Sequence, residues 1–467
     1  MNRKLLYGLI TVGVGVLIWL LPVPAGLKPS AWQLFALFVA TIVGFILQPM
    51  PIGAIAFLSV GLAGFMKVIS PADALSGFGN TTIWLIVTAF LFAKGFIKTG
   101  LGRRIAYTIM NLIGDSSLKL GYALTLSDLV IAPFTPSNTA RAGGILYPIV
   151  RSLCSAFDSE PGPSSRKIGS YLMKTSFQIN GITSSMFITA VAPNSLVVLL
   201  AAKTANLNIS WGIWALAGIV PGLVALAVTP YILYKLYPPE IKHTPEAKEL
   251  AYRELEKMGP MSRGEKIVAS VFLLALTLWA TSSITGLDAT MVAMVCVGIM
   301  IIGQAIEWKD VVEEKSAWDT LIWMGALMSL AGALTKVGLI AWFAKEVSGQ
   351  LAGVSWWVAL GILLLAYMYS HYAFASLSAH VTAMYAAFLA VAVAAGAPVF
   401  LAAMGLGVIS GFMGGITHYG TGPAPIYFGA GYIFQGTWWK LGFVLSVSNM
   451  IIWIGLGGFW WKLLGLW

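Results

Sequence analysis

Charged residues are scarce in this chain of 467 residues. Asp, Glu, Lys and Arg make up 10% of it, whereas a soluble globular chain carries about 25%. Cysteine is rarer still: Cys154 and Cys296 lie far apart in apolar sequence and carry no information about a redox compartment. Hydrophobic residues reach 58%. This composition excludes a soluble fold, disfavours catalysis on soluble substrates and is typical of a polytopic membrane protein.

The formal net charge of +10 does not indicate a nucleic-acid partner, because the cations are scattered at the ends of apolar runs. The positive-inside rule explains them and places Arg3 and Lys4 on the cytoplasmic side. The run from Leu5 to Gly26 is too long for a signal h-region and lacks a small-residue cleavage site, so we interpret it as a retained first crossing. We expect a multi-pass protein of the cell inner or plasma membrane, with a cytoplasmic N-terminus and an external C-terminus.

Several long apolar segments are interrupted in their middle. In the segment 119–150, residues 133–139 (PFTPSNT) separate two arms of about 15 residues, too short to span a bilayer, which predicts a re-entrant helical hairpin. The segment 80–113 is too long for one perpendicular crossing, and we expect it to tilt or break near Gly100. The segment 171–202 is expected to break at Pro193-Asn194.

The most charged stretch, 235–266, contains a predicted helix. Thr244 and Pro245 form a suitable N-cap and first residue, apolar residues follow at helical spacing, and Gly259-Pro260 ends the pattern. An amphipathic helix on the inner leaflet joining two halves is one interpretation, and a plain solvated linker is the other.

The second half of the chain repeats the first. Residues 83–84 (IW) recur at 322–323, and Ser137-Asn138-Thr139 recurs as Ser376-Leu377-Ser378, both at an offset of 239 residues. We therefore predict an all-α polytopic membrane protein with about 11 transmembrane helices and two re-entrant hairpins in an inverted repeat. The expected divisions are an N-terminal transmembrane helix (1–30), a first inverted repeat with a cytoplasmic-side hairpin (31–237), a cytoplasmic linker helix (238–266) and a second inverted repeat with an extracellular-side hairpin (267–467).

The repeated triplets suggest a binding site. Each hairpin tip presents a helix N-terminus, which attracts anions, together with neutral donors suited to carboxylate oxygens. One triplet alone is typical of an ordinary capping turn, but its recurrence favours a site for a ligand with two carboxylates. A further break near residues 421–423 and the one at Pro193-Asn194 would close this site. The expected substrate-binding residues are Ser137, Asn138, Thr139, Ser376, Leu377, Ser378, Thr421 and Asn194.

Two ionisable residues follow the tips at equivalent positions, Arg141 and His380. We expect them to compensate the charge of a bound dianion. An ion pair between Arg141 and Asp128 is a structural alternative, and the two roles can coexist. A site that retains fixed positive charge when empty would cross the membrane slowly, which would make exchange obligatory.

A metal site is a weak alternative. His371, His380 and His418 all lie in apolar segments, but no two histidines are spaced three or four residues apart on a helix, and no carboxylate lies nearby. We therefore expect no metal, no cofactor and no enzyme activity.

Three segments resemble the divalent anion/sodium symporter (DASS, or INDY) family: 132–141 (APFTPSNTAR), 94–102 (KGFIKTGLG) and 371–376 (HYAFAS). The resemblance covers essentially the whole chain and is closest to the exchanger branch, the bacterial citrate/succinate and tartrate/succinate antiporters and the plastid 2-oxoglutarate/malate translocators. It implies a homodimer in which a mobile part carries the substrate past a scaffold like an elevator.

The second tip departs from the pattern of sodium-coupled members, which have Ser-Asn-Thr at both tips. Leu377 replaces that asparagine and removes an oxygen ligand that sodium would need. The leading hypothesis is a sodium-independent exchanger of C4 to C6 dicarboxylates such as succinate, malate, fumarate and 2-oxoglutarate. The alternatives are a sodium- or proton-coupled di- or tricarboxylate symporter, with protons carried by His380 or Asp128, and an anion channel, which would not need two occluding hairpins.

Overall fold

The computed structural model describes residues 3–339, 342, 346 and 355–467. These residues form helices and connecting loops, and no strand occurs among them. Seven of the helices are long and apolar enough to cross a membrane, and three shorter helices are also apolar. The predicted all-α polytopic fold is confirmed.

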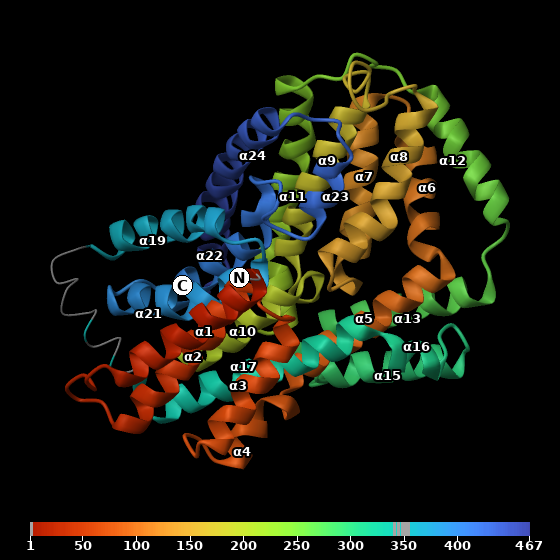
Figure 1. Cartoon of the computed structure of the whole chain (residues 1–467). Coiled ribbons are helices and arrows are strands. Elements are labelled where there is room, and N and C mark those ends of the chain that lie inside the picture. Colours follow the sequence, from red (N-terminus) through yellow and green to blue (C-terminus); the bar gives the residue numbers. More distant parts are fainter. Residues whose placement is uncertain (1–2, 340–341, 343–345, 347–354) are drawn as a thin grey trace.

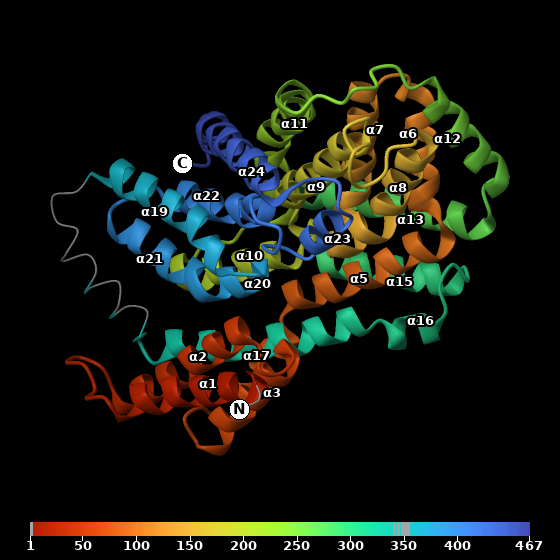
Figure 2. The same cartoon turned by 45° about the horizontal axis from the view of Figure 1, so that its top comes forward.

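A first group of helices forms the lower part of the molecule in Figures 1 and 2. Its central members pack on one another, with α17 against α3 and α5, and α15 against α5 and α13. The group comprises α1 (Arg3–Leu20), α2 (Pro29–Leu47), α3 (Ile52–Phe65), α4 (Pro71–Leu75), α5 (Thr81–Thr99), α13 (Arg263–Ala280), α14 (Ser282–Thr285), α15 (Ala289–Ile302), α16 (Trp308–Glu313) and α17 (Lys315–Lys336).

The second group, called here the hairpin group, contains two helical hairpins. The first hairpin runs through α7 (Ser117–Ile131), a tip, a π-helical turn at Ala140–Leu146 and α8 (Tyr147–Ala156). The second repeats this order in α19 (Trp356–Ser370), a tip, α20 (Leu377–His380), a π-helical turn at Val381–Tyr385 and α21 (Ala386–Ala394). A π-helical turn thus follows both tips, and such turns are frequent at functional sites.

The hairpin group also contains two broken helices and two continuous ones. One break separates α9 (Gly169–Met186) from α10 (Ala192–Ala205), and the other separates α22 (Val399–Phe412) from α23 (Pro423–Gly429). The first continuous helix is α11 (Trp211–Leu236). The second runs through α24 (Gln435–Met450), a π-helical turn at Ile451–Leu456 and α25 (Gly457–Leu463).

The position of the first break corrects a prediction. The chain leaves the helix at residues 187–191, before Pro193-Asn194, and Pro193 lies in the first turn of α10. Proline is tolerated there because the first N–H groups of a helix have no partner within it. The predicted break near residues 421–423 is confirmed, since α23 starts at Pro423.

The predicted break near Gly100 is also confirmed. Gly100 has a φ of 80°, a conformation that glycine adopts without strain, and it separates α5 from α6 (Leu101–Ile113). The chain therefore turns at Gly100, and α6 leaves the direction of α5 to pack against α12 and α7.

The linker helix exists as α12 (Pro245–Met258), and it buries Ala247 and Ala251 completely. It packs against α6 at the edge of the molecule (Figure 1), which favours an amphipathic helix over a plain solvated linker, and its place on the inner leaflet stays a prediction. Thr244 and Pro245 take the predicted N-cap and first helical positions, but the Thr244 side chain does not cap the helix. Its hydroxyl donates instead to the main-chain oxygen of Gly114 at 3.0 Å, because the chain before α12 is hydrogen-bonded to the loop between α6 and α7.

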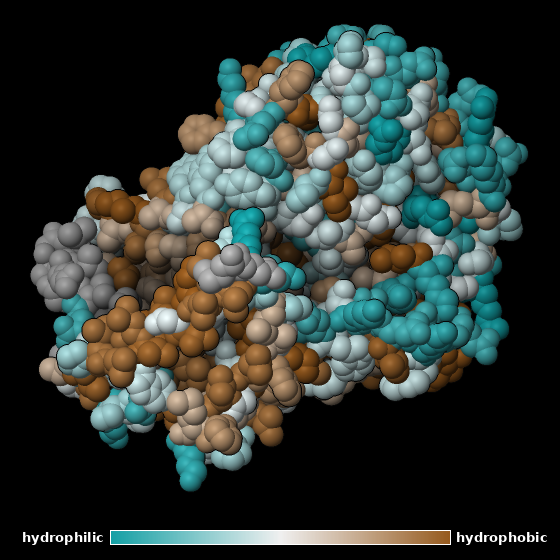
Figure 3. All heavy atoms as spheres, viewed as in Figure 1, coloured by the Kyte–Doolittle hydropathy of each residue, from teal (hydrophilic) through white to brown (hydrophobic). Residues whose placement is uncertain are grey.

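The surface differs between two regions of the molecule. Apolar residues gather over α1 to α3, and hydrophilic residues cover the region of α12 (Figure 3). Helix α1 buries none of its residues, and Leu5, Val12 and Leu17 are each more than half exposed. An apolar face of this kind suits contact with lipid or with another apolar surface.

Candidate functional site

The first hairpin tip contacts the second broken helix. The hydroxyl of Ser137 caps the following helix by accepting a hydrogen bond from the main-chain N–H of Ala140 at 3.1 Å. The side-chain amide of Asn138 donates to the hydroxyl of Thr421 at 2.8 Å. Ser137 and Thr139 stay half-buried, and Asn138 is 8% exposed. The structure therefore brings together four predicted site residues, Ser137, Asn138, Thr139 and Thr421.

The loop 416–422 approaches this tip closely at Gly422. A Cβ atom there would collide with the hydroxyl of Thr139. A larger residue at this point would displace the Thr139 side chain, because the loop main chain lies directly against the tip.

The second hairpin contacts the same loop. Ser376 caps α20 by accepting from the N–H of Ala379 at 3.3 Å. Ser376 and Ser378 are half-buried and Leu377 is 5% exposed. The ring Nε2 of His371, at the end of the first arm, lies 2.7 Å from the main-chain oxygen of Gly420. The two hairpins thus hold neighbouring residues of one loop, Gly420 and Thr421.

His371 was not among the predicted site residues. Its position in an apolar segment and in the 371–376 motif was the sequence feature that could have marked it as a candidate site residue. No sequence pattern, however, pairs a histidine with a main-chain oxygen 49 residues away.

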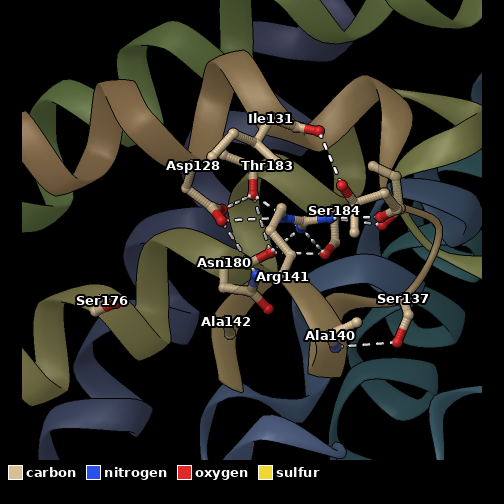
Figure 4. A network of polar contacts seen from close by, with 12 residues as sticks. Asp128, Ile131, Ser137, Ala140, Arg141, Ala142, Ser176, Asn180, Thr183 and Ser184 are labelled. Carbon is tan, nitrogen blue, oxygen red and sulfur yellow. Dashed lines mark hydrogen bonds and ion pairs between the residues drawn. The ribbon is translucent and has the colours of Figure 1, made fainter. Parts of the chain in front are cut away.

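Arg141 lies completely buried behind the first tip (Figure 4). Its Nε donates to Asp128 at 2.9 Å, and both side chains are 0% exposed. Its Nη1 donates to the main-chain oxygens of Thr135 and Ala190, each at 2.9 Å. Its Nη2 reaches the hydroxyls of Thr183 and Ser184 at 3.2 and 2.9 Å.

These contacts occupy all five N–H donors of the guanidinium. Arg141 therefore joins the tip, through Thr135, to the first break, through Ala190, and its charge is balanced by Asp128. The geometry favours the ion-pair alternative. A charge-compensating role for Arg141 stays a prediction.

His380 takes the equivalent place behind the second tip. Its Nε2 lies 3.0 Å from the hydroxyl of Ser370 and its Nδ1 lies 2.9 Å from the sulfur of Met413. The rings of Tyr367 and Phe374 pack against it. Like Arg141, His380 joins its hairpin to a broken helix, here at Met413, and its charge-compensating role also stays a prediction.

Asn194 lies away from the tips. It is 0% exposed, and its side-chain amide donates to the main-chain oxygens of Ser184 at 2.6 Å and Phe187 at 2.8 Å. These bonds span the break between α9 and α10. The structure therefore gives Asn194 a place in closing the break and does not bring it together with the other predicted binding residues.

The three intramembrane histidines do not form one cluster. The rings of His371 and His380 are 5.1 Å apart, but His418 packs against Phe428 and accepts from the indole of Trp439 at 3.1 Å. In the part of the chain that the structure describes, no three His, Cys, Asp or Glu residues are placed to hold a metal ion.

A family model and several known proteins match nearly the full length of this chain. Residues 2–467 match the family described as the sodium:sulfate symporter transmembrane region. The chain is 52% identical over 465 residues to YflS of Bacillus subtilis (strain 168), covering 99% of this chain and 97% of that protein. It is 49% identical over 462 residues to dicarboxylate transporter 1, chloroplastic, of Spinacia oleracea, covering 98% and 81%.

A solved structure, that of the YdaH transporter of Alcanivorax borkumensis, shares the fold. It matches with a TM-score of 0.56 and 13% identity over 99% of this chain and 97% of that one. With a family match over residues 2–467 and a relative 52% identical, the chain belongs to the divalent anion/sodium symporter family of multi-pass membrane proteins.

Proposed function

We propose that this protein exchanges C4 to C6 dicarboxylates across the membrane, independently of sodium, by an elevator movement. The observation that carries the proposal is the convergence of both hairpins on the loop 416–422, through Asn138 to Thr421 and His371 to Gly420. A relative 49% identical to this chain is named a dicarboxylate transporter, which supports the substrate class.

The tips suit a small dianion. Ser137, Thr139, Ser376 and Ser378 are half-buried, so their hydroxyls combine partial access with a water-poor setting. Hydroxyls and main-chain N–H groups at a helix start are good donors to carboxylate oxygens. Two such tips provide one set of donors for each end of a dicarboxylate. Leu377, which offers no oxygen, supports independence from sodium.

The arrangement of the two groups supports an elevator. Both hairpins and both broken helices belong to the hairpin group, which would move past the first group as one body. The contact between the groups is interrupted by a cavity of about 420 Å³, whose lining includes Trp32 on α2, Leu334 on α17 and Thr382 on the second hairpin. In this proposal the N-terminus is cytoplasmic, the C-terminus is external, and the apolar face over α1 to α3 contacts lipid or a second copy of the chain.

The proposal is tested by loading proteoliposomes. We expect labelled succinate to enter vesicles preloaded with unlabelled succinate much faster than it enters empty vesicles. The physical reason is that an empty carrier with fixed positive charge crosses a low-dielectric barrier slowly. Equal rates in the two preparations would contradict exchange. An electrical current across the vesicle membrane that does not require exchange of substrate would instead indicate a channel.

Sodium replacement tests the coupling. Changing sodium for choline outside succinate-loaded vesicles should leave the uptake rate unchanged, because Leu377 cannot act as a cation ligand. A rate that rises steeply with sodium, or that follows an imposed proton gradient, would indicate a coupled symporter of the same substrates.

A further inference from the structure

The cavity between the two groups of helices is an elongated apolar pocket. It measures about 420 Å³, and Figure 2 shows α2 and α17 facing α10 and α21 across it. Its lining includes Trp32, Phe35, Phe38, Val39 and Ile42 on α2, and Ala383, Ala386, Ala387 and Ala390 on the second hairpin. On each helix these residues recur three or four positions apart, so they form one face and the pocket follows the helix axis.

The length of the pocket matches one leaflet of a bilayer. Between Trp32 and Ile42, both in the lining, α2 rises by about 15 Å. The hydrocarbon core of a membrane is about 30 Å thick. The pocket therefore has the length of a lipid acyl chain that reaches from the membrane surface to the bilayer centre.

The lining does not suit a dicarboxylate. The indole N–H groups of Trp32 and Trp342 already donate to main-chain oxygens, at 2.8 and 3.0 Å. The hydroxyls of Thr204 and Thr382 are buried inside the protein, so these residues add no accessible donor to the pocket. A dianion would lose its hydration there without replacement, whereas a hydrocarbon chain would gain contacts.

A single cation lies at one end of the pocket. Among the described residues that line it, only Lys203 is charged, and it lies in the last turn of α10. Its Nζ reaches α17, because a Cβ atom on Gly332 would lie 4.0 Å from it. Within the described parts of the chain, no acid pairs with Lys203 and no hydrogen bond holds its ammonium. This positive charge is therefore available to a ligand.

The same end of the pocket has the features of a membrane surface. Trp32 lies in the first turn of α2 and Leu334 in the last turn of α17, so three helices start or end close to Lys203. Tryptophan is enriched at the level of the lipid headgroups, and lysine side chains extend along apolar surface to place their ammonium there. Lipid phosphates lie at this level.

We propose that this pocket binds an anionic phospholipid, with one acyl chain between the two groups of helices and the phosphate at Lys203. Ala387 and Lys203 are exposed, so the pocket opens to the surface that the bilayer surrounds. Because its walls belong to both groups, a bound lipid stabilises this arrangement of the groups and slows their movement past one another. The effect on movement rests on the proposed elevator exchange, and the binding site does not.

The binding test is a lipid titration of the delipidated protein in detergent, followed by its melting temperature. The probes are phosphatidylglycerol, phosphatidylcholine with the same acyl chains, and inorganic phosphate. We expect both lipids to raise the melting temperature, with phosphatidylglycerol half-saturating at a roughly fivefold lower concentration because one lysine attracts its net charge. Inorganic phosphate alone should have no effect, since it has no acyl chain. An equal rise with phosphate would indicate a simple ion site and overturn the proposal.

Variants at Lys203 test the headgroup contact. Lys203→Gln should remove the difference between the two lipids, and Lys203→Arg should keep it. Lys440→Gln, at an exposed lysine of α24 outside this pocket, is the matched control and should behave as the wild type. A preference for phosphatidylglycerol that survives Lys203→Gln would place the anionic lipid elsewhere.

Variants in the pocket test the acyl chain. Ala387→Phe places a ring in the space of the chain and should weaken the binding of both lipids. Ala227→Phe, at an exposed position of α11 outside this pocket, should not. If Ala387→Phe does not fold, Ala383→Leu fills the same face of the second hairpin. Unchanged lipid binding in a folded pocket variant would overturn the site.

The exchange rate tests the effect on movement. In succinate-loaded vesicles, adding phosphatidylglycerol to phosphatidylcholine should lower the maximal rate of the wild type more than that of Lys203→Gln. A general repulsion of succinate by an anionic membrane would affect the two proteins equally. Equal responses would remove the restraint on movement. A wild type that exchanges no succinate in either membrane would remove the proposed function, while the melting temperatures would still decide the lipid site.

Discussion

Replacing Arg141 by methionine is expected to lower the free energy of unfolding by about 3 to 5 kcal/mol. The substitution leaves Asp128 charged and 0% exposed, without the partner that lies 2.9 Å from it in the structure. It also removes the bonds to Thr135 and Ala190 that join the first tip to the first break. Denaturant unfolding in detergent measures the stability, and succinate exchange measures the function.

A double variant separates charge from geometry. Arg141→Met combined with Asp128→Leu should recover most of the lost stability, because no unpaired charge remains. Exchange should stay impaired, because the tip is still detached from the break. Arg103→Met, at an exposed arginine of α6, is the matched control and should change stability by less than about 0.5 kcal/mol. A double variant that exchanges at the wild-type rate would show that Arg141 does not position the tip.

Asn138→Ala and Ser376→Ala should each weaken apparent succinate affinity by roughly ten- to a hundredfold. Losing one donor to a charged ligand costs about 1.5 to 3 kcal/mol. Asn138 additionally loses its 2.8 Å bond to Thr421, so the loop is released from the tip. The KM for exchange in loaded proteoliposomes measures the effect.

Two controls accompany these variants. Ser152→Ala removes an exposed serine on α8, far along the same hairpin, and should leave the KM unchanged. Ser376→Thr keeps the hydroxyl that caps α20 and should retain most of the affinity. If both alanine variants transport with the wild-type KM, the substrate must bind elsewhere.

Local features of the chain predicted most of the elements. Pro133 and Pro136 inside an arm too short to span a bilayer indicate a hairpin, and the tip lies at 135–139 in the structure. Gly100 and Pro423 mark real helix boundaries, because positive φ and a missing N–H are local properties of a residue. The same reasoning placed the first break too late at Pro193, since proline is equally compatible with the first turn of a helix.

Side-chain partners could be predicted less well. Asp128 and Arg141 are 13 residues apart on one hairpin, and their pairing was open as an alternative. Asn138 and Thr421 are 283 residues apart, so nothing local could indicate their hydrogen bond. The residue type of Asn194 suggested a contact with the substrate. In the structure its side-chain amide donates to main-chain oxygens across the break between α9 and α10.

The sequence by itself determined that this chain is an all-α membrane protein with repeated hairpins and repeated polar tips. Composition, helical length and proline placement are properties of short segments, and burial in a bilayer leaves helices as the way to satisfy the backbone. The tertiary structure alone decided which buried polar groups meet. Arg141 meets Asp128, Thr183 and Ser184 because α9 packs against α7 and the π-helical turn of the first hairpin, and an electrostatic effect depends on those distances.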